Sequence, residues 1–231
     1  MKYYWLTNSI DTKIIGKYPQ SESAYNAPKF WNDVEKGLIN ENLTIPEPIL
    51  HKNAKLTSYL SSVPIINLSF LILNRELFNL VKPSINGEYI TWKIKIHYRD
   101  SIVNDYFLFH LLTTSQKKYV DYENSEFYIG KIDDYKWIGE SIRIYNHENF
   151  LSTKEILRNE NLIVKVKKLQ MNFKNSSEDF IRINDSPTIV GGSGYYVSEK
   201  LKDAIEKSGF TGMAFIDIEE IDNRNRIKVI Y

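Results

Sequence analysis

The chain has 231 residues, of which 42% are hydrophobic, and its 30 basic and 29 acidic residues give a formal net charge of +1. Such a chain can bury a sizeable core and is not intrinsically disordered, and its charge balance offers no general attraction to nucleic acid or to anionic membranes. The absence of cysteine excludes disulfides and thiolate metal sites.

The first fifty residues predict little regular structure after an opening strand. Lys2–Leu6 is strongly β-prone and opens a sheet, and Lys13–Ile15 predicts a second, shorter strand. One helical turn is expected at Trp31–Lys36. Pro46 and Pro48 then keep the chain extended, because proline restricts both its own backbone and that of the residue before it.

The middle of the chain predicts antiparallel hairpins. Tyr89–Tyr98 alternates apolar and polar residues with period two, and Tyr106–Leu112 is more continuously apolar, as expected for a strand inside a sheet. Phe127–Ile132 and Trp137–Tyr145 predict two further strands joined by a tight acidic turn.

Shorter elements follow in the next forty residues. Ser152–Glu155 has the pattern of a capping box, which predicts a helix that begins there and ends near Asn159. Leu162–Leu169 and Phe180–Ile183 predict strands.

A strand–cap–helix unit lies near the C-terminus. Ser198 follows a strand that begins at Tyr195 and is a favourable N-cap for an amphipathic helix, which Gly209 ends. Met213–Ile218 then predicts another strand. The same pattern occurs at Leu71–Val81, where Asn74 takes the cap position, so the unit is predicted to be used twice.

These elements predict an α+β fold of mostly antiparallel sheet with three or four short helices, because strands and helices do not alternate regularly. No linker-like segment interrupts the chain, so residues 1–231 are expected to form a single domain; a division into two lobes would fall near residues 115–120. There is no signal-peptide pattern, and no apolar run approaches the ~20 residues that span a bilayer, so we expect a cytoplasmic protein without a membrane partner.

The C-terminal stretch YVSEKLKDAI…GFTGMAF resembles the signature of a bacterial immunity-protein family of polymorphic toxin systems. The aromatic opening Tyr3-Tyr4-Trp5-Leu6 also resembles the first strand of such proteins. The resemblance implies a protein that neutralises a cognate toxin by stoichiometric binding, without catalysis and without a cofactor. The matching C-terminal residues are Val197, Ser198, Glu199, Leu201, Ala204, Ile205, Gly209, Thr211, Gly212 and Phe215.

The candidate partner-binding residues are Asp133, Asp134, Tyr135 and Trp137, in the predicted turn after Phe127–Ile132. Exposed aromatic residues beside carboxylates suit a protein interface, where Tyr and Trp often dominate the binding energy. The alternative is an ordinary turn whose Trp137 folds back into the core.

Two other functions remain open at this stage. The Gly191–Gly194 loop could hold a phosphate or nucleotide in an enzyme, although it has neither of the usual glycine-rich nucleotide motifs and is also explained as a hairpin loop. Lys165, Lys167 and Lys168 could form the basic face of a small RNA-binding domain. A solvated strand face is the better explanation of these lysines, and nucleic acid is an unexpected partner for a nearly neutral chain.

The four histidines, His51, His97, His110 and His147, show no metal-ligand spacing, so no metal site is expected. His97 and His110 belong to neighbouring predicted strands and could meet across them. His147 is expected in a solvated turn.

Overall fold

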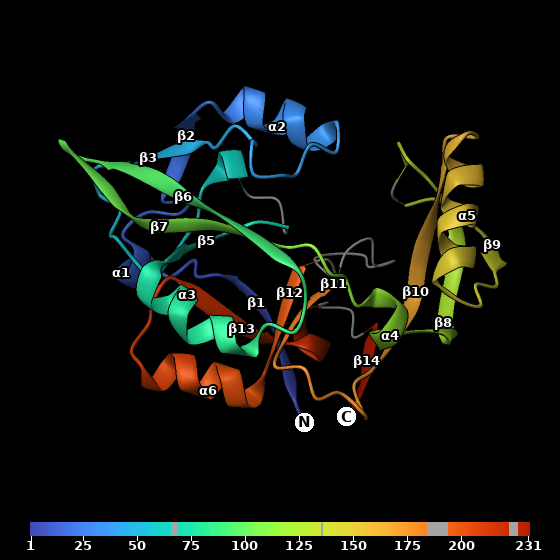
Figure 1. The fold of residues 1–231 in the computed structure, drawn as a ribbon. Helices are drawn as coiled ribbons and strands as arrows, with labels where there is room; N and C mark the ends of the chain where they lie inside the picture. Colours follow the sequence, from blue (N-terminus) through green and yellow to red (C-terminus); the bar gives the residue numbers. More distant parts are fainter. Residues whose placement is uncertain (66–68, 135, 184–193, 222–225) are drawn as a thin grey trace.

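The computed structural model describes residues 1–65, 69–134, 136–183, 194–221 and 226–231 (Figure 1). In these ranges the chain forms fourteen β-strands and six α-helices, so the predicted α+β class is confirmed. The strands form three sheets, and most neighbouring strands are antiparallel. None of the helices in the described ranges is long and apolar enough to cross a membrane.

The first and last parts of the chain meet in a four-stranded sheet, here called the central sheet. Its strand order is β11-β12-β1-β13, and each neighbouring pair is antiparallel. The four strands are β1 (Tyr3–Asn8), β11 (Phe180–Ile183), β12 (Gly194–Ser198) and β13 (Met213–Asp217).

A six-stranded sheet, the large sheet, is built from the first half of the chain. Its order is β2-β3-β6-β7-β5-β4, with one parallel pair between β3 and β6. Its strands are β2 (Ser21–Tyr25), β3 (Glu47–Leu50), β4 (Tyr59–Leu60), β5 (Leu71–Asn74), β6 (Tyr89–Tyr98) and β7 (Ser101–Leu111).

The third sheet, the distal sheet, has the order β14-β10-β8-β9. Figure 1 shows it on the opposite side of the molecule from the large sheet, with α5 along it. The chain enters this sheet at Val120, directly after α4 (Gln116–Tyr119). Its strands are β8 (Val120–Lys131), β9 (Ile138–Ile142), β10 (Leu162–Asn172) and β14 (Ile227–Ile230).

The central sheet separates two hydrophobic cores. Because successive side chains of a strand point to opposite faces, Tyr195 packs with the large sheet, whereas Tyr196 packs with the distal sheet. The same division separates Leu6 from Tyr3 on β1 and Phe180 from Ile181 on β11. A third core lies within the large sheet, against α2.

The strand–cap–helix unit does occur twice. Asn74 and Ser198 accept hydrogen bonds from the third amide of the helix that follows, at 2.9 Å and 3.1 Å respectively. These helices, α3 (Arg75–Val81) and α6 (Glu199–Lys207), lie side by side in Figure 1 and bury Leu77 and Leu201 in one core.

The other helices correct four expectations. Lys13–Ile15 lies in a single helical turn, α1 (Thr12–Ile15), because Asp11 caps it by accepting from the Lys13 amide at 2.8 Å. The predicted turn at Trp31–Lys36 belongs to a longer helix, α2 (Ala27–Glu35). The helix expected from Ser152 begins at His147 as α5 (His147–Arg158), where Asn146 supplies the cap. With the short α4 (Gln116–Tyr119), the described chain has six helices rather than the expected three or four.

Gly212, the last glycine of the G-x-T-G segment, lies where the C-terminal unit contacts the large sheet. Tyr59 donates its amide to the Thr211 carbonyl at 3.0 Å, and Ser9 donates to the Gly212 carbonyl at 3.0 Å. Gly212 has φ +97°, and a Cβ there would lie 2.0 Å from the Tyr59 carbonyl oxygen. Only glycine fits this close approach.

Candidate functional site

The predicted binding turn connects β8 to β9 at the end of the distal sheet. Asp133, Asp134 and Trp137 lie together in this turn, and Tyr135 lies outside the described residues. Asp134 has a structural role, because its carboxylate accepts the amides of Lys136 and Trp137 at 3.0 Å and 3.2 Å. Asp133 is exposed. We call the described apolar and acidic part of this turn, residues 132–134 and 137–138, the hairpin tip.

Trp137 neither enters the core nor projects freely into solvent. Its ring lies against Gly139, where a Cβ would approach the ring to 2.5 Å, and the side chain remains 36% exposed. The Lys131 ammonium lies 5.1 Å from the ring centroid, within range of a cation–π interaction. Ile138 follows in the sequence with 66% exposure, so two consecutive residues carry large exposed apolar side chains.

A shallow groove of about 420 Å³ continues from the hairpin tip across the distal sheet. Ile138, Tyr128 and Val166 supply its apolar surface, and Lys167 and Arg226 supply positive charge. The sequence analysis did not find this groove. The groove depends on the register of β8 with β10, which brings residues distant in sequence together.

The basic strand face is partly neutralised within the protein. The Lys165 ammonium donates to the Asp134 and Trp137 carbonyls at 3.1 Å and 3.3 Å, and thereby holds the turn against β10. Lys167 lies 3.0 Å from the Glu126 carboxylate. Two of the three lysines considered for RNA binding therefore already have partners within the protein.

Of the glycine loop Gly191–Gly194, only Gly194 lies within the residues that the structure describes. Gly194 is the first residue of β12 and lines a cavity of about 180 Å³ between the central and large sheets. The expected phosphate or nucleotide site at Gly191–Gly194 therefore stays a prediction.

A buried polar cluster joins the central sheet to the large sheet. Arg182 donates to the Leu111 carbonyl at 2.5 Å and to the Ser69 hydroxyl at 3.0 Å. His110 lies 3.3 Å from Arg182 through Nε2, and its Nδ1 donates to the Ser69 carbonyl at 2.7 Å, as a neutral imidazole would. Burial, reinforced by the Arg182 charge, lowers the pKa of His110 to about 4. The sequence signal that could have revealed this cluster is Arg182, a charged residue within the otherwise apolar strand Phe180–Ile183.

The other histidines correct two expectations. His97 pairs in register with Ile102 and His110 with Ile90, so they lie at opposite ends of the β6–β7 hairpin and do not meet. His147 is buried in the first turn of α5, where Nδ1 lies 2.8 Å from the Tyr122 hydroxyl, rather than in a solvated turn. Within the described ranges, no group of three or more His, Cys, Asp or Glu residues could hold a metal ion.

Comparison with known proteins adds no relative. No protein-family model matches the chain, and a search of curated proteins finds no significant match.

Proposed function

We propose that this protein is an immunity protein that binds a cognate bacterial toxin and neutralises it by occlusion. The proposal rests first on the C-terminal residues that resemble the signature of such a family. In the structure these residues build the strand–cap–helix unit and its contact with the large sheet: Ser198 caps α6, and Gly212 approaches Tyr59. They explain the architecture, so the partner-binding surface must be sought elsewhere.

The observation that carries the proposal is the apolar surface of the hairpin tip. Trp137 and Ile138 are consecutive residues with exposed side chains, and the groove extends from Ile138 over Tyr128. Adjoining exposed apolar side chains are typical of protein interaction sites, and a Trp anchor often dominates the binding energy. We place the toxin contact on the hairpin tip and the groove.

The surroundings of the hairpin tip favour a pre-organised contact. Lys165 holds the turn carbonyls, Asp134 caps the turn amides and Gly139 seats the Trp137 ring. A surface held in this way loses little conformational entropy on binding, which favours affinity. In the described chain, β9 pairs on one side only, with β8, so an extended toxin segment could also add to its free edge.

The direct experiment is co-expression with the toxin encoded next to this gene. We expect the protein to restore growth and to form a 1:1 complex that inhibits the purified toxin stoichiometrically. Unchanged killing and no complex with any neighbouring toxin would reject the proposal. A toxin from an unrelated system is the control, because specific occlusion should give it no protection.

The two other functions have their own tests. An enzyme that uses the Gly191–Gly194 loop should gain thermal stability from a nucleotide or from phosphate, because a ligand that binds the native state stabilises it. An RNA-binding domain should retain RNA in a manner that weakens steeply with salt.

A further inference from the structure

The segment between the short helical turn η2 (Lys82–Ser84) and β6 contains Asn86-Gly87, the only place in the chain where glycine follows asparagine. Asn86 is exposed, and both residues lie outside the helices and strands. Among the residues that the structure describes, none forms a hydrogen bond with the Asn86 side chain or with the Gly87 amide. Both groups are therefore available for a reaction between them.

An asparagine side chain can be attacked by the amide nitrogen of the next residue. Here the Gly87 nitrogen bonds to the side-chain carbonyl carbon of Asn86, and its proton passes through solvent to the side-chain nitrogen, which leaves as ammonia. The product is a succinimide ring, and water opens it at one or the other carbonyl to give aspartate or isoaspartate. Glycine favours the ring closure, because it has no Cβ to obstruct the approach and its backbone is the most permissive.

Asn124, which precedes Ser125, is in the opposite situation. Its side-chain nitrogen donates to both carboxylate oxygens of Asp121, at 3.1 Å and 2.9 Å, and its backbone amide donates to the same carboxylate at 3.2 Å. The side chain is therefore held toward Asp121, and the next residue carries a Cβ. Asn124 provides a comparison within the same molecule.

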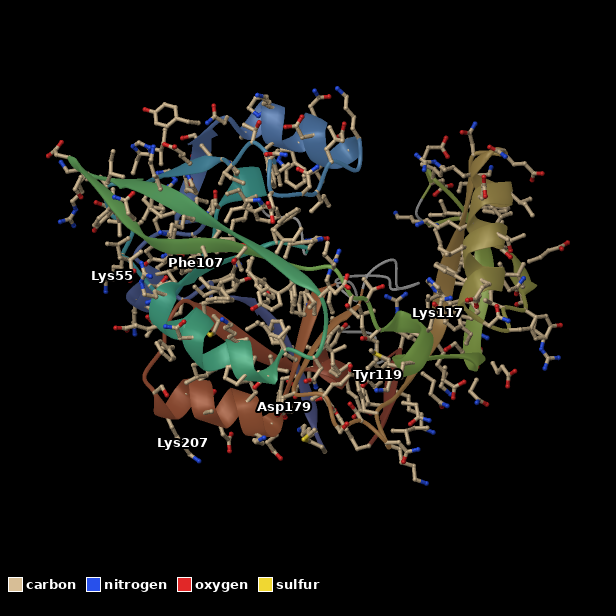
Figure 2. All side chains as sticks on the ribbon, viewed as in Figure 1. Lys55, Phe107, Lys117, Tyr119, Asp179 and Lys207 are labelled. Carbon is tan, nitrogen blue, oxygen red and sulfur yellow. The ribbon has the colours of Figure 1, made fainter. Side chains whose placement is uncertain are left out.

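The main chain is anchored on both sides of the asparagine–glycine pair. Ile85 forms a parallel β-bridge with Phe180 of the central sheet. Asp179, the neighbour of Phe180, is labelled in Figure 2 and marks where this contact lies. On the other side, Glu88 donates its amide to the Thr113 hydroxyl at 3.0 Å. Isoaspartate adds a carbon to the main chain between these anchors, whereas aspartate leaves its length unchanged.

We propose that Asn86 is a site of spontaneous deamidation in the folded protein, a reaction that consumes one water and releases one ammonia. The aspartate product adds a negative charge on an exposed segment and is tolerated. The isoaspartate product lengthens the main chain between Ile85 and Glu88, and therefore weakens the contact that this segment makes with the central sheet. The proposal is independent of toxin binding, because it concerns a different segment and a different chemistry.

Incubation of the full chain in mildly alkaline buffer, followed by peptide mass spectrometry, measures the conversion of each asparagine. We expect Asn86 to be converted faster than Asn124 and than every other asparagine that the structure describes. A parallel incubation in urea should convert Asn86 as well, because the reacting groups are adjacent in the chain. The proposal is overturned if Asn86 stays intact in the folded protein, whatever happens in urea, or if Asn124 is converted as fast.

Variants separate the two products. Freshly purified Asn86→Asp carries the charge of the aspartate product and should unfold at the same urea concentration as the unaltered protein. The incubated protein should unfold at a lower urea concentration, in proportion to the isoaspartate that labelling with an isoaspartyl methyltransferase measures. Asn86→Gln is the matched control, because its longer side chain would have to close a larger ring, and it should keep its stability during the same incubation. Equal losses in Asn86→Gln and in the unaltered protein would refute the effect assigned to isoaspartate.

Discussion

Tyr195 and Tyr196 are adjacent in the chain, yet their rings enter different hydrophobic cores on opposite faces of the central sheet. The Tyr195 hydroxyl donates to the Ser69 carbonyl at 2.8 Å and accepts the Leu111 amide at 3.1 Å, so it also ties β12 to the large sheet. Strand β12 is buried along its whole length. Strand β12, which opens the C-terminal signature, therefore belongs to the sheet against which both other sheets pack.

Replacing Gly212 should destabilise the protein more than replacing Gly209, another glycine with positive φ. In Gly212→Ala the new Cβ would approach the Tyr59 carbonyl to 2.0 Å while the backbone stays at φ +97°. Strain of this kind costs about 1–3 kcal/mol, and the overlap adds to it. Gly209→Ala is the matched control, because it has φ +73° with nothing within 4 Å of a Cβ. Urea unfolding of both variants measures the difference, and equal losses would contradict the docking role of Gly212.

The N-caps Asn74 and Ser198 should contribute different amounts to the free energy of unfolding, although their capping geometry is the same. Asn74→Ala should reduce the free energy of unfolding by about 1 kcal/mol, which is typical of a lost cap. Ser198→Ala should cost about 2 kcal/mol, because the Ser198 hydroxyl also donates to the Asp179 carboxylate at 2.6 Å. Ser198→Thr keeps the hydroxyl and serves as the control in the same unfolding experiment. A larger loss for Asn74→Ala would contradict this ranking.

His110 should make stability depend on pH. Its pKa is lowered to about 4 in the folded protein, mainly by burial and also by Arg182, against about 6.5 when unfolded. The unfolded chain therefore binds the proton more readily, so this contribution is complete above pH 6.5 and is lost as the pH falls toward 4. The loss is on the order of 3 kcal/mol. Urea unfolding at several pH values measures how the free energy of unfolding changes with pH. Between pH 6.5 and 4 this change should be smaller in His110→Gln than in the unaltered protein, and an equal change would contradict the assignment.

The hairpin tip should carry much of the proposed toxin affinity. Trp137→Ala and Ile138→Ala should each raise the Kd about tenfold to a hundredfold, as truncation of an interface anchor does. Ile102→Ala is the matched control, since Ile102 is also an exposed isoleucine, at 52%, on a different hairpin. Titration calorimetry with the purified toxin measures all three. Unchanged affinity in the Trp137 and Ile138 variants would move the contact to another surface.

Much of the architecture follows from patterns within a few residues of each other. A cap and the amide it serves are three residues apart, so Asn74 and Ser198 were found from sequence. Period-two alternation likewise predicted the β6–β7 and β8–β9 hairpins. For α5 the local signals competed: the capping box at Ser152 pointed to a later start, but Asn146 caps a helix that begins five residues earlier.

The candidate site was only partly predictable. The composition of the turn marked Asp133, Asp134 and Trp137 as a surface feature, and they do lie together. The turn residues did not reveal that Asp134 supports the turn or that Trp137 lies on Gly139. The groove depends on cross-strand register, and the cavity depends on the approach of two sheets whose residues are distant in sequence.

The sequence by itself determined many of the strands in the second half of the chain, the residues that cap the two repeated helices, and that the fold is α+β, because those signals act over one turn or one strand. Tertiary structure alone decided that Tyr195 and Tyr196 serve different cores, that His147 is buried, and that Arg182 meets His110. The physical reason is that burial and charge environment arise from contacts between distant segments. Arg182 and His110 are separated by 72 positions, and no local pattern encodes which distant partner a side chain will meet.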